Sequence, residues 1–326
     1  MSEQTNPEAK AATAAAMPLI VTLVLFAALA LIPLLAQFYG GGWLTSLAVR
    51  AMLLAIAAIS LDLLIGHGGL VSFGHSAFIA IGAYTCGIMI TEGVDEIALI
   101  LPVAMAVAGG FALVSGAISL RTSGVSFIMI TLAFGQMVYF ALGSLAQYGA
   151  DDGLTLWAAP GFLGGKWLAS DIGVYVTVLL LLIGTWVLVH RITGSRFGRV
   201  LRAARQNPVR VASMGYPVRR YQLAAYCIAG IIASVAGVMW AVQFAFVSPS
   251  LSAWQSSGDL IVMVILGGMA SRNGALIGAL CFILIEESLS AITNDWRLIF
   301  GPFLVLIALY ARGGLAGLLD RMRGPQ

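Results

Sequence analysis

The stretch RITGSRFGRVLRAARQNPVRVASMGYPVRR, residues 191–220, decides how the rest of the chain is arranged. It holds eight of the fifteen arginines, and no acidic residue lies between Asp171 and Asp259 to offset them. Apolar sequence of membrane-spanning length flanks it, GVYVTVLLLLIGTWVLV before and YQLAAYCIAGIIASVAGVMWAV after. Because basic connectors between membrane spans stay in the cytoplasm, we expect residues 191–220 on the cytoplasmic side of a membrane.

This basic segment also has the pattern of two short helices. Residues 196–206 are predicted to form the first helix. Arg199, Arg202 and Arg205 recur every three residues and therefore share one of its faces. A second helix is predicted over residues 208–214.

Local signals define the ends of the second helix. Asn207 is suited to cap its start, Pro208 to occupy its first position, and Gly215 to adopt the left-handed conformation that ends it. Two capped helices held at a membrane surface between two spans indicate a segment that contacts another protein and moves with it.

The composition is that of a polytopic membrane protein. Of the 326 residues 60% are apolar and 10% are charged, and the net charge is +3. The mean hydropathy of +0.98 excludes a sizeable soluble domain. No nucleotide-binding or zinc-protease motif occurs, and Cys86, Cys227 and Cys281 lack metal-ligand spacing. We therefore expect no catalytic residues, no metal site and no bound nucleotide.

The predicted fold is all-α, with about ten transmembrane helices. Each has the roughly 20 apolar residues that a span needs, except the third, eighth and tenth, which are shorter. The spans are 19–38, 43–65, 74–91, 97–120, 124–146, 172–190, 221–246, 258–271, 274–293 and 296–311. With ten spans the basic connectors and both termini fall inside and the acidic connectors fall outside, as the positive-inside rule requires.

The predicted organisation follows from these spans. A cytoplasmic tail at 1–18 precedes a membrane domain at 19–312, and a second cytoplasmic tail occupies 313–326. The longest outer connector is a periplasmic loop at 147–171, rich in glycine, aspartate and tryptophan.

Two glycine-rich breaks interrupt the apolar sequence. Residues 66–75, GHGGLVSFGH, disfavour a continuous helix. They fit either a re-entrant element of a transport path or a tight inner turn, and the residues alone leave both open. A second break at Gly267 and Gly268, followed by Gly274, loosely echoes the first. Paired breaks indicate inverted repeats around a central translocation site.

Charged residues inside the spans have several explanations. Glu286 and Glu287 each cost about 2.5–3.5 kcal/mol on a lenient insertion scale. We expect them to pair with an arginine of a neighbouring subunit, to face water or to stay protonated. Asp62 lies close to the inner end of its span, where we expect its carboxylate to extend to the aqueous boundary in a structural role.

Five blocks of the sequence resemble LivM-type permease subunits of branched-chain amino acid ABC importers. The resemblance runs from about residue 44 to residue 320 and so covers nearly the whole chain. The blocks are GHGGLVSFGHSAFIAIGAYT (66–85), SGVSFIMITLAFGQMVYFAL (123–142), GADDGL (149–154), FGRVLRAARQNPVRVASMGYPVRRYQLAAYCIAG (197–230) and LGGMASRNGALIGA (266–279).

This resemblance implies a multi-pass permease of the bacterial inner membrane that works with partner proteins. These are a LivH-type sister permease, two LivG/LivF-type ATPase subunits and a periplasmic solute-binding protein, besides membrane lipid and without nucleic acid. ATP and Mg²⁺ would be used by the ATPases, so no cofactor is expected on this chain. LivM-like chains also serve importers of urea, short amides and aromatic acids, so the solute is a branched-chain amino acid or another small metabolite.

The resemblance also implies three functional regions. ATPase coupling falls on Arg202, Arg205, Asn207, Pro208, Met214 and Gly215. The translocation path and gate fall on Gly68, Gly69, Ser72, Gly74, His75 and Gln136. Asp151 and Asp152 would contact the binding protein, or else cap their own turn. The arginines have a further explanation in binding anionic lipid headgroups.

A stand-alone secondary transporter with inverted repeats is the main alternative function. It would need carboxylates near the membrane midplane, for which Glu286 and Glu287 are the candidates. A self-sufficient carrier has no use for an ATPase-docking helix pair, so we expect a permease subunit of an ATP-driven importer.

Overall fold

The computed structural model describes residues 21–36, 42–162, 164–165, 167–293, 295–310, 314–315 and 317. This part of the chain is overwhelmingly helical, which confirms the predicted all-α fold class. The predicted tail at 1–18 lies outside the described residues, as does most of the tail at 313–326.

Twelve α-helices make up most of the described chain. The first helix is Val21–Ala36. It is followed by α2 Gly42–Asp62, α3 His75–Thr91, α4 Ile97–Ser119, α5 Val125–Gly143, α6 Asp171–Gly194, α7 Arg196–Gln206, α8 Pro208–Ser213, α9 Val218–Phe244, α10 Trp254–Gly267, α11 Gly274–Ser290 and α12 Trp296–Tyr310.

Shorter elements join these helices. α2 continues without interruption into a π-helical turn, η1 Leu63–Gly68. The 3₁₀ turns are η2 Ala146–Tyr148, η3 Ala150–Asp152, η4 Trp167–Ala169 and η5 Pro249–Ser252. Two short strands, β1 Leu154–Thr155 and β2 Phe246–Val247, pair antiparallel and join the long loop after α5 to the end of α9.

Each of the ten predicted spans overlaps a helix among the described residues. Five helices are long and apolar enough to cross a membrane by themselves: Gly42–Gly68, Ile97–Ser119, Val125–Gly143, Asp171–Gly194 and Val218–Phe244. The fold is therefore that of a multi-pass helical membrane protein.

The predicted eighth span, 258–271, was placed four residues too late. α10 begins at Trp254 and ends at Gly267, because Gly268 has a φ of 111° that no right-handed helix can accommodate. The apolar sequence continues past this residue, so hydropathy alone does not detect the end of the helix.

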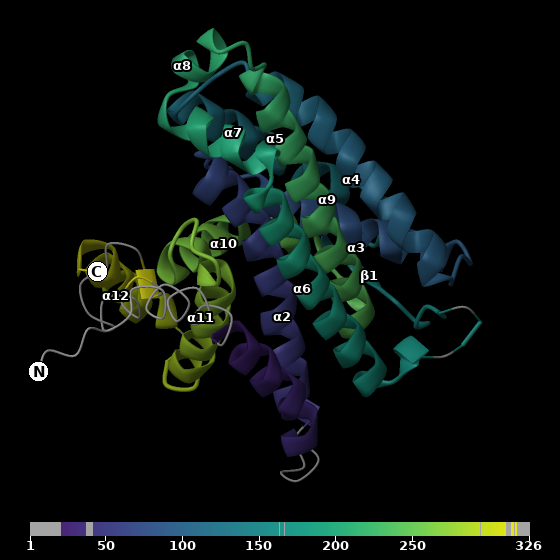
Figure 1. The fold of residues 1–326 in the computed structure, drawn as a ribbon. Helices are drawn as coiled ribbons and strands as arrows, with labels where there is room; N and C mark the ends of the chain where they lie inside the picture. The colour runs from purple at the N-terminus through teal and green to yellow at the C-terminus, as the bar shows by residue number, and fades with distance from the viewer. Residues whose placement is uncertain are drawn as a thin grey trace, which may run out of the picture. The chain divides into compact units, whose positions relative to one another are not determined.

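The chain divides into a small unit at residues 1–48 and a large unit at 49–326, and all packing described below lies within the large unit. In that unit α7 and α8 lie at the end of α6 and the start of α9, and β1 lies toward the opposite end of α9 (Figure 1). Helices α7 and α8 thus lie at one end of α9, and the β1–β2 pair lies at the other.

Close backbone approach holds α3 against α9. A Cβ atom at Gly237 of α9 would overlap the Ile79 carbonyl of α3, and one at Gly82 of α3 would overlap the Ser234 carbonyl of α9. Lipid tails are as apolar as the side chains, so helices in membranes associate through tight packing of small residues rather than through burial from water. α3 is buried along most of its length as a result.

Substituting Gly237 tests this packing. We expect Gly237→Val to destabilise the protein by about 1–3 kcal/mol or more, since the new side chain forces α3 and α9 apart. Thermal unfolding of the detergent-purified protein measures the loss. Gly110→Val is the matched control, because a Cβ at Gly110 of α4 meets no atom within 4 Å. Equal stability of the two variants would contradict the role assigned to this contact.

Candidate functional site

Residues 191–220, called the coupling segment after the role predicted for them, contain the two helices that their sequence predicts. The side-chain oxygen of Asn207 accepts a hydrogen bond from the Arg210 backbone N–H at 3.0 Å, and Pro208 occupies the first turn of α8. Gly215 follows the helix with a φ of 86°. The local structure predicted for this segment is confirmed, because caps and turn residues act over a few positions.

The tip of the coupling segment is exposed and partly apolar. Val209 and Met214 have exposed fractions of 77% and 68%. Asn207, Pro208 and Gly215 are exposed as well. The tip therefore presents apolar side chains that nothing in the described chain covers.

The opposite face of α7 is anchored to the membrane helices. Leu201 and Ala204 are buried. Arg202 Nη1 donates a hydrogen bond to the Thr193 carbonyl at the end of α6, at 2.9 Å. Arg205 Nη1 donates to the Gly66 carbonyl in η1. Both predicted coupling arginines thus join α7 to other elements, whereas the tip residues point away from them.

The first glycine break, residues 66–75, begins where α2 becomes π-helical. Gly69 ends the π-helical turn with a φ of 68°, and its N–H donates to the Ile65 carbonyl at 3.2 Å. A Cβ atom at Gly69 would lie 2.8 Å from Cγ of Arg205. The break therefore contacts α7 directly, and Gly68 and Gly69 leave room for this helix. π-helical turns occur often at functional sites.

The second glycine break, residues 267–274, meets the first. The Ala270 N–H donates a 2.9 Å hydrogen bond to Oδ1 of Asp62, at the end of α2. A Cβ atom at Gly66 would overlap both Asp62 and the Ala270 nitrogen. The two breaks, far apart in sequence, thus lie side by side.

The prediction that Asp62 extends to water was wrong. Its exposed fraction is 5%. The π-helical turn continues the helix beyond Asp62, so the side chain remains among protein groups and satisfies the backbone of the second break. The structural role predicted for this residue is correct, but it is a buried one.

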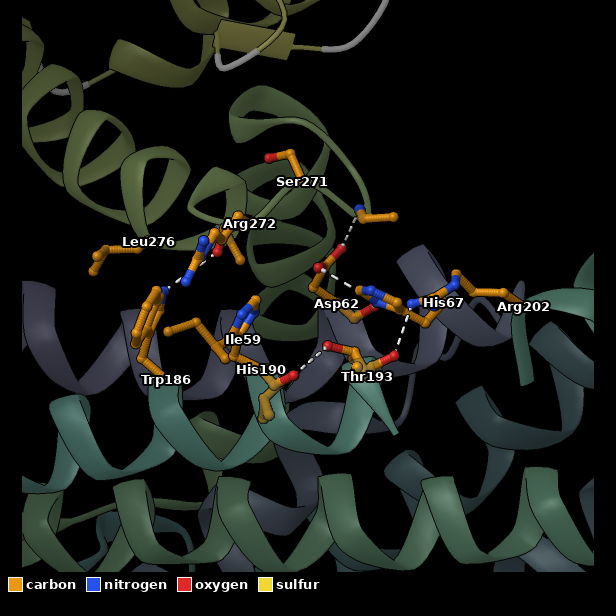
Figure 2. Close-up of a pocket in the computed structure, with 14 residues that line it drawn as sticks. Ile59, Asp62, His67, Trp186, His190, Thr193, Arg202, Ser271, Arg272 and Leu276 are labelled. Atoms are coloured by element: carbon orange, nitrogen blue, oxygen red, sulfur yellow. Dashed lines mark hydrogen bonds and ion pairs between the residues drawn. The ribbon is translucent and has the colours of Figure 1, made fainter. Parts of the chain in front are cut away.

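A pocket of about 220 Å³ lies at this junction. Figure 2 shows Asp62, His67, Arg202 and Thr193 at one side of it and Trp186, His190 and Arg272 at the other. Trp186 Nε1 donates to Oδ1 of Asn273 at 3.1 Å, and the ring of Trp186 stacks on His190 with centroids 5.4 Å apart. The junction thus joins α2, α6, α7 and the second glycine break.

The other predicted gate residues lie away from this pocket. His75 is fully buried at the start of α3, with Nε2 at 2.8 Å from Oγ of Ser60. Ser72 is buried, and a Cβ at Gly74 would overlap the Thr131 carbonyl of α5. Gln136 lies on α5 and is half-buried. The first break thus packs against α5 at Gly74, and the role of these four residues in a path or gate stays a prediction.

Asp151 and Asp152 lie in an exposed 3₁₀ turn near the β1–β2 pair. Neither carboxylate makes a hydrogen bond to its own turn among the described residues. Nearby, the Tyr148 hydroxyl donates to Oε1 of Glu92 at 2.9 Å, which raises the pKa of Tyr148. This loop therefore presents carboxylates at the end of the molecule opposite the coupling segment.

Two ion pairs were not predicted from the sequence. Arg50 of α2 binds Glu286 of α11 at 2.8 Å, so Glu286 pairs within its own chain rather than with a neighbouring subunit. Nη2 of Arg297 on α12 lies 3.3 Å from Oδ2 of Asp259 on α10. The sequence shows that opposite charges occur in different spans, but it does not indicate which of them form ion pairs.

Comparison with known proteins agrees with the resemblance seen in the sequence blocks. The family model for the permease component of branched-chain amino acid transport systems matches residues 43–309. The chain belongs to this family. It is 28% identical to the high-affinity branched-chain amino acid permease protein LivM of Escherichia coli over 294 residues, which cover 82% of this chain and 69% of LivM.

Other permease proteins are similar over comparable lengths. BraD, a high-affinity branched-chain amino acid permease protein of Pseudomonas aeruginosa, is 22% identical over 281 residues, or 81% of this chain and 91% of BraD. RbsC, a ribose import permease protein of Escherichia coli, is 24% identical over 269 residues, or 78% of this chain and 80% of RbsC. No solved structure matches the chain significantly.

Asp62 offers a direct test of the junction in this permease. We expect Asp62→Leu to lower the free energy of unfolding by about 1–3 kcal/mol, because the buried Ala270 N–H loses its acceptor. Asp62→Asn keeps a side-chain oxygen at the same place and should cost much less. Thermal unfolding of the purified protein compares the two, and a leucine variant as stable as the asparagine variant would exclude the proposed role of this hydrogen bond.

Proposed function

We propose that this chain is the LivM-type half of the membrane channel of an ATP-driven importer, with a LivH-type permease as the other half. The importer would take up a branched-chain amino acid or a related small solute, as the names of LivM and BraD state for those proteins. The ribose permease RbsC shows that similar chains belong to importers of other solutes.

The coupling segment is the observation that carries this proposal. Its tip exposes Val209 and Met214, whereas its α7 is hydrogen-bonded to η1 and to α6. An exposed apolar tip on a helix anchored to membrane spans is suited to enter a groove on another protein and to transmit its movement. We infer that the partner with this groove is a cytoplasmic ATPase. The ATPase, and not this chain, would bind ATP and Mg²⁺.

The proposed mechanism is alternating access. Closure of the ATPase dimer on ATP would displace α8 and α7, and Arg202 and Arg205 would carry this displacement to α6 and to the first glycine break. Because the second break rests on Asp62, both breaks would move together. Rotation of the spans would then open the path alternately to each side of the membrane.

The proposed orientation places the coupling segment, with its eight arginines, in the cytoplasm and the loop of Asp151 and Asp152 in the periplasm. A solute-binding protein would dock on the exposed carboxylates of that loop. The pairing of Glu286 with Arg50 argues against a stand-alone ion-coupled carrier, because such a carrier needs a carboxylate that can bind the coupling ion.

The composition of the native complex tests this function. We expect the chain, purified in mild detergent from native membranes, to be recovered with a second permease and two ATPase subunits. Subunit masses and stoichiometry from native mass spectrometry measure this. Recovery of the chain alone, in a form that moves solute without ATP, would refute the proposal.

The role of the tip is tested by Met214→Glu. A carboxylate at this exposed position should weaken ATPase docking and lower ATP-dependent uptake at least tenfold without loss of membrane insertion, because a charge enters an apolar contact. Uptake in proteoliposomes and ATP hydrolysis are measured together. Val125→Glu is the control, since Val125 is 68% exposed at the start of α5, where a helix tolerates an acidic residue. Wild-type uptake in Met214→Glu would contradict the coupling role.

A further inference from the structure

The pocket at the junction contains more positive than negative charge. Two arginines line it, Arg202 of α7 and Arg272 of the second glycine break, and neither forms an ion pair with a described residue. Among the described residues that line the pocket, the only acidic one is Asp62. Its carboxylate is already engaged, because Oδ1 accepts from the Ala270 N–H and Oδ2 lies 3.9 Å from Nδ1 of His67. The arginines are therefore left to bind an anion from outside the chain.

Contacts with Trp186 hold Arg272 in place. The guanidinium carbon of Arg272 lies 5.5 Å from the centroid of the Trp186 ring, and Trp186 Nε1 donates to the Arg272 carbonyl at 3.3 Å. His190, one helical turn further along α6, stacks on the same ring with centroids 5.4 Å apart. Figure 2 shows these three side chains together, on the side of the pocket away from Asp62. A guanidinium fixed on an aromatic ring loses little conformational entropy when it binds an anion.

The side chains that line the pocket have hydrogen-bond donors to spare. A guanidinium carries its N–H donors in a planar fork. Arg202 uses Nη1 on the Thr193 carbonyl, and its other donors make no hydrogen bond to a described residue. The guanidinium of Arg272 and the ring nitrogens of His190 make none either within the described part of the chain. Phosphate oxygens match this supply, because they accept several charge-assisted hydrogen bonds from planar guanidinium groups.

The pocket lies near the end of a membrane-spanning helix. Helix α6 has 24 residues and is therefore roughly 36 Å long, whereas the hydrocarbon core is about 30 Å thick. Its ends thus reach the headgroup region, and His190 is exposed only four residues before its last residue, Gly194. Beside it on α6, Val187 and Leu188 are apolar and have exposed fractions of 41% and 49%, as lipid-facing residues have. Cationic and lipid-facing side chains therefore meet at this end of α6.

We propose that this pocket binds a phosphate ester, supplied by the headgroup of an anionic phospholipid. Basic pockets between membrane helices on the cytoplasmic side are suited to such headgroups. The pocket volume of about 220 Å³ admits a headgroup rather than a whole lipid. A phosphate that contacts both Arg202 and Arg272 joins α7 to the second glycine break, and so stabilises the junction. The inference uses the proposed orientation of the chain and is independent of the solute that the chain transports.

Lipid binding to the full chain, together with the subunits that co-purify with it, tests the pocket. The protein is depleted of lipid in detergent and mixed with phosphatidylglycerol or with phosphatidylcholine, and native mass spectrometry measures the affinity for each. We expect phosphatidylglycerol to bind more tightly, because its headgroup has a net negative charge. Arg272→Gln should weaken this binding about fivefold or more, since one arginine contact with the phosphate is lost. Because Arg272 is exposed, the variant should remain folded.

Arg191→Gln is the matched control. Arg191 is exposed and follows His190 directly on α6, but it does not line the pocket. This variant removes the same charge at the same level of the membrane, so it should bind phosphatidylglycerol as the wild type does. Arg272→Lys keeps the charge and should bind more tightly than Arg272→Gln. Equal weakening in Arg191→Gln and Arg272→Gln would indicate a general attraction to basic surface and would overturn the assignment of the pocket.

A second measurement separates a lipid from a soluble phosphate. Thermal unfolding is followed with inorganic phosphate, and with chloride at the same ionic strength. If phosphate raises the unfolding temperature of the wild type but not of Arg272→Gln, while phosphatidylglycerol does not bind, the site is a phosphate site and its source is soluble. If the wild type and Arg272→Gln respond alike to both probes, the pocket binds no phosphate ester and the proposal is wrong.

Discussion

The hydrogen bond from the Ala270 N–H to the Asp62 carboxylate shows the constraint on which the rest of the structure depends. In a membrane every backbone polar group needs a partner within the protein, so a helix can be broken only where other groups cover the break. Here the chain breaks twice, at residues 66–75 and 267–274, and Asp62, just before the first break, accepts a hydrogen bond from the Ala270 N–H of the second. Arg205 supplies a further donor to the carbonyl of Gly66. Side chains of neighbouring elements thus satisfy backbone groups in both breaks.

The first glycine break contacts α7, so the coupling segment lies next to backbone of the membrane domain that is not α-helical. The anchored face of α7 carries Leu201, Arg202, Ala204 and Arg205, and the exposed tip carries Val209 and Met214. Helix α7, which precedes the tip, is thus hydrogen-bonded both to η1 and to the end of α6. Helix α3 is held against α9 by close contacts at Gly82 and Gly237.

The intramembrane charges follow two different physical solutions. Asp62 is buried and accepts a hydrogen bond from a backbone N–H, so its role is structural. Arg50 with Glu286, and Arg297 with Asp259, form partly exposed ion pairs. The Asp62 carboxylate thus satisfies a backbone N–H, whereas the carboxylates of Glu286 and Asp259 are each paired with an arginine.

The sequence by itself determined the fold class, the approximate positions of the helices, both helices of the coupling segment with their caps, and the permease family. Those features depend on apolar length, local caps such as Asn207, and blocks of contiguous residues. Only the tertiary structure decided that Asp62 reaches Ala270, 208 positions away, and that Arg50 reaches Glu286, 236 positions away. It also moved the end of α10 to Gly267 and buried Asp62. A single sequence carries no local signal for which distant charge or break will be a neighbour, because that depends on how whole helices pack.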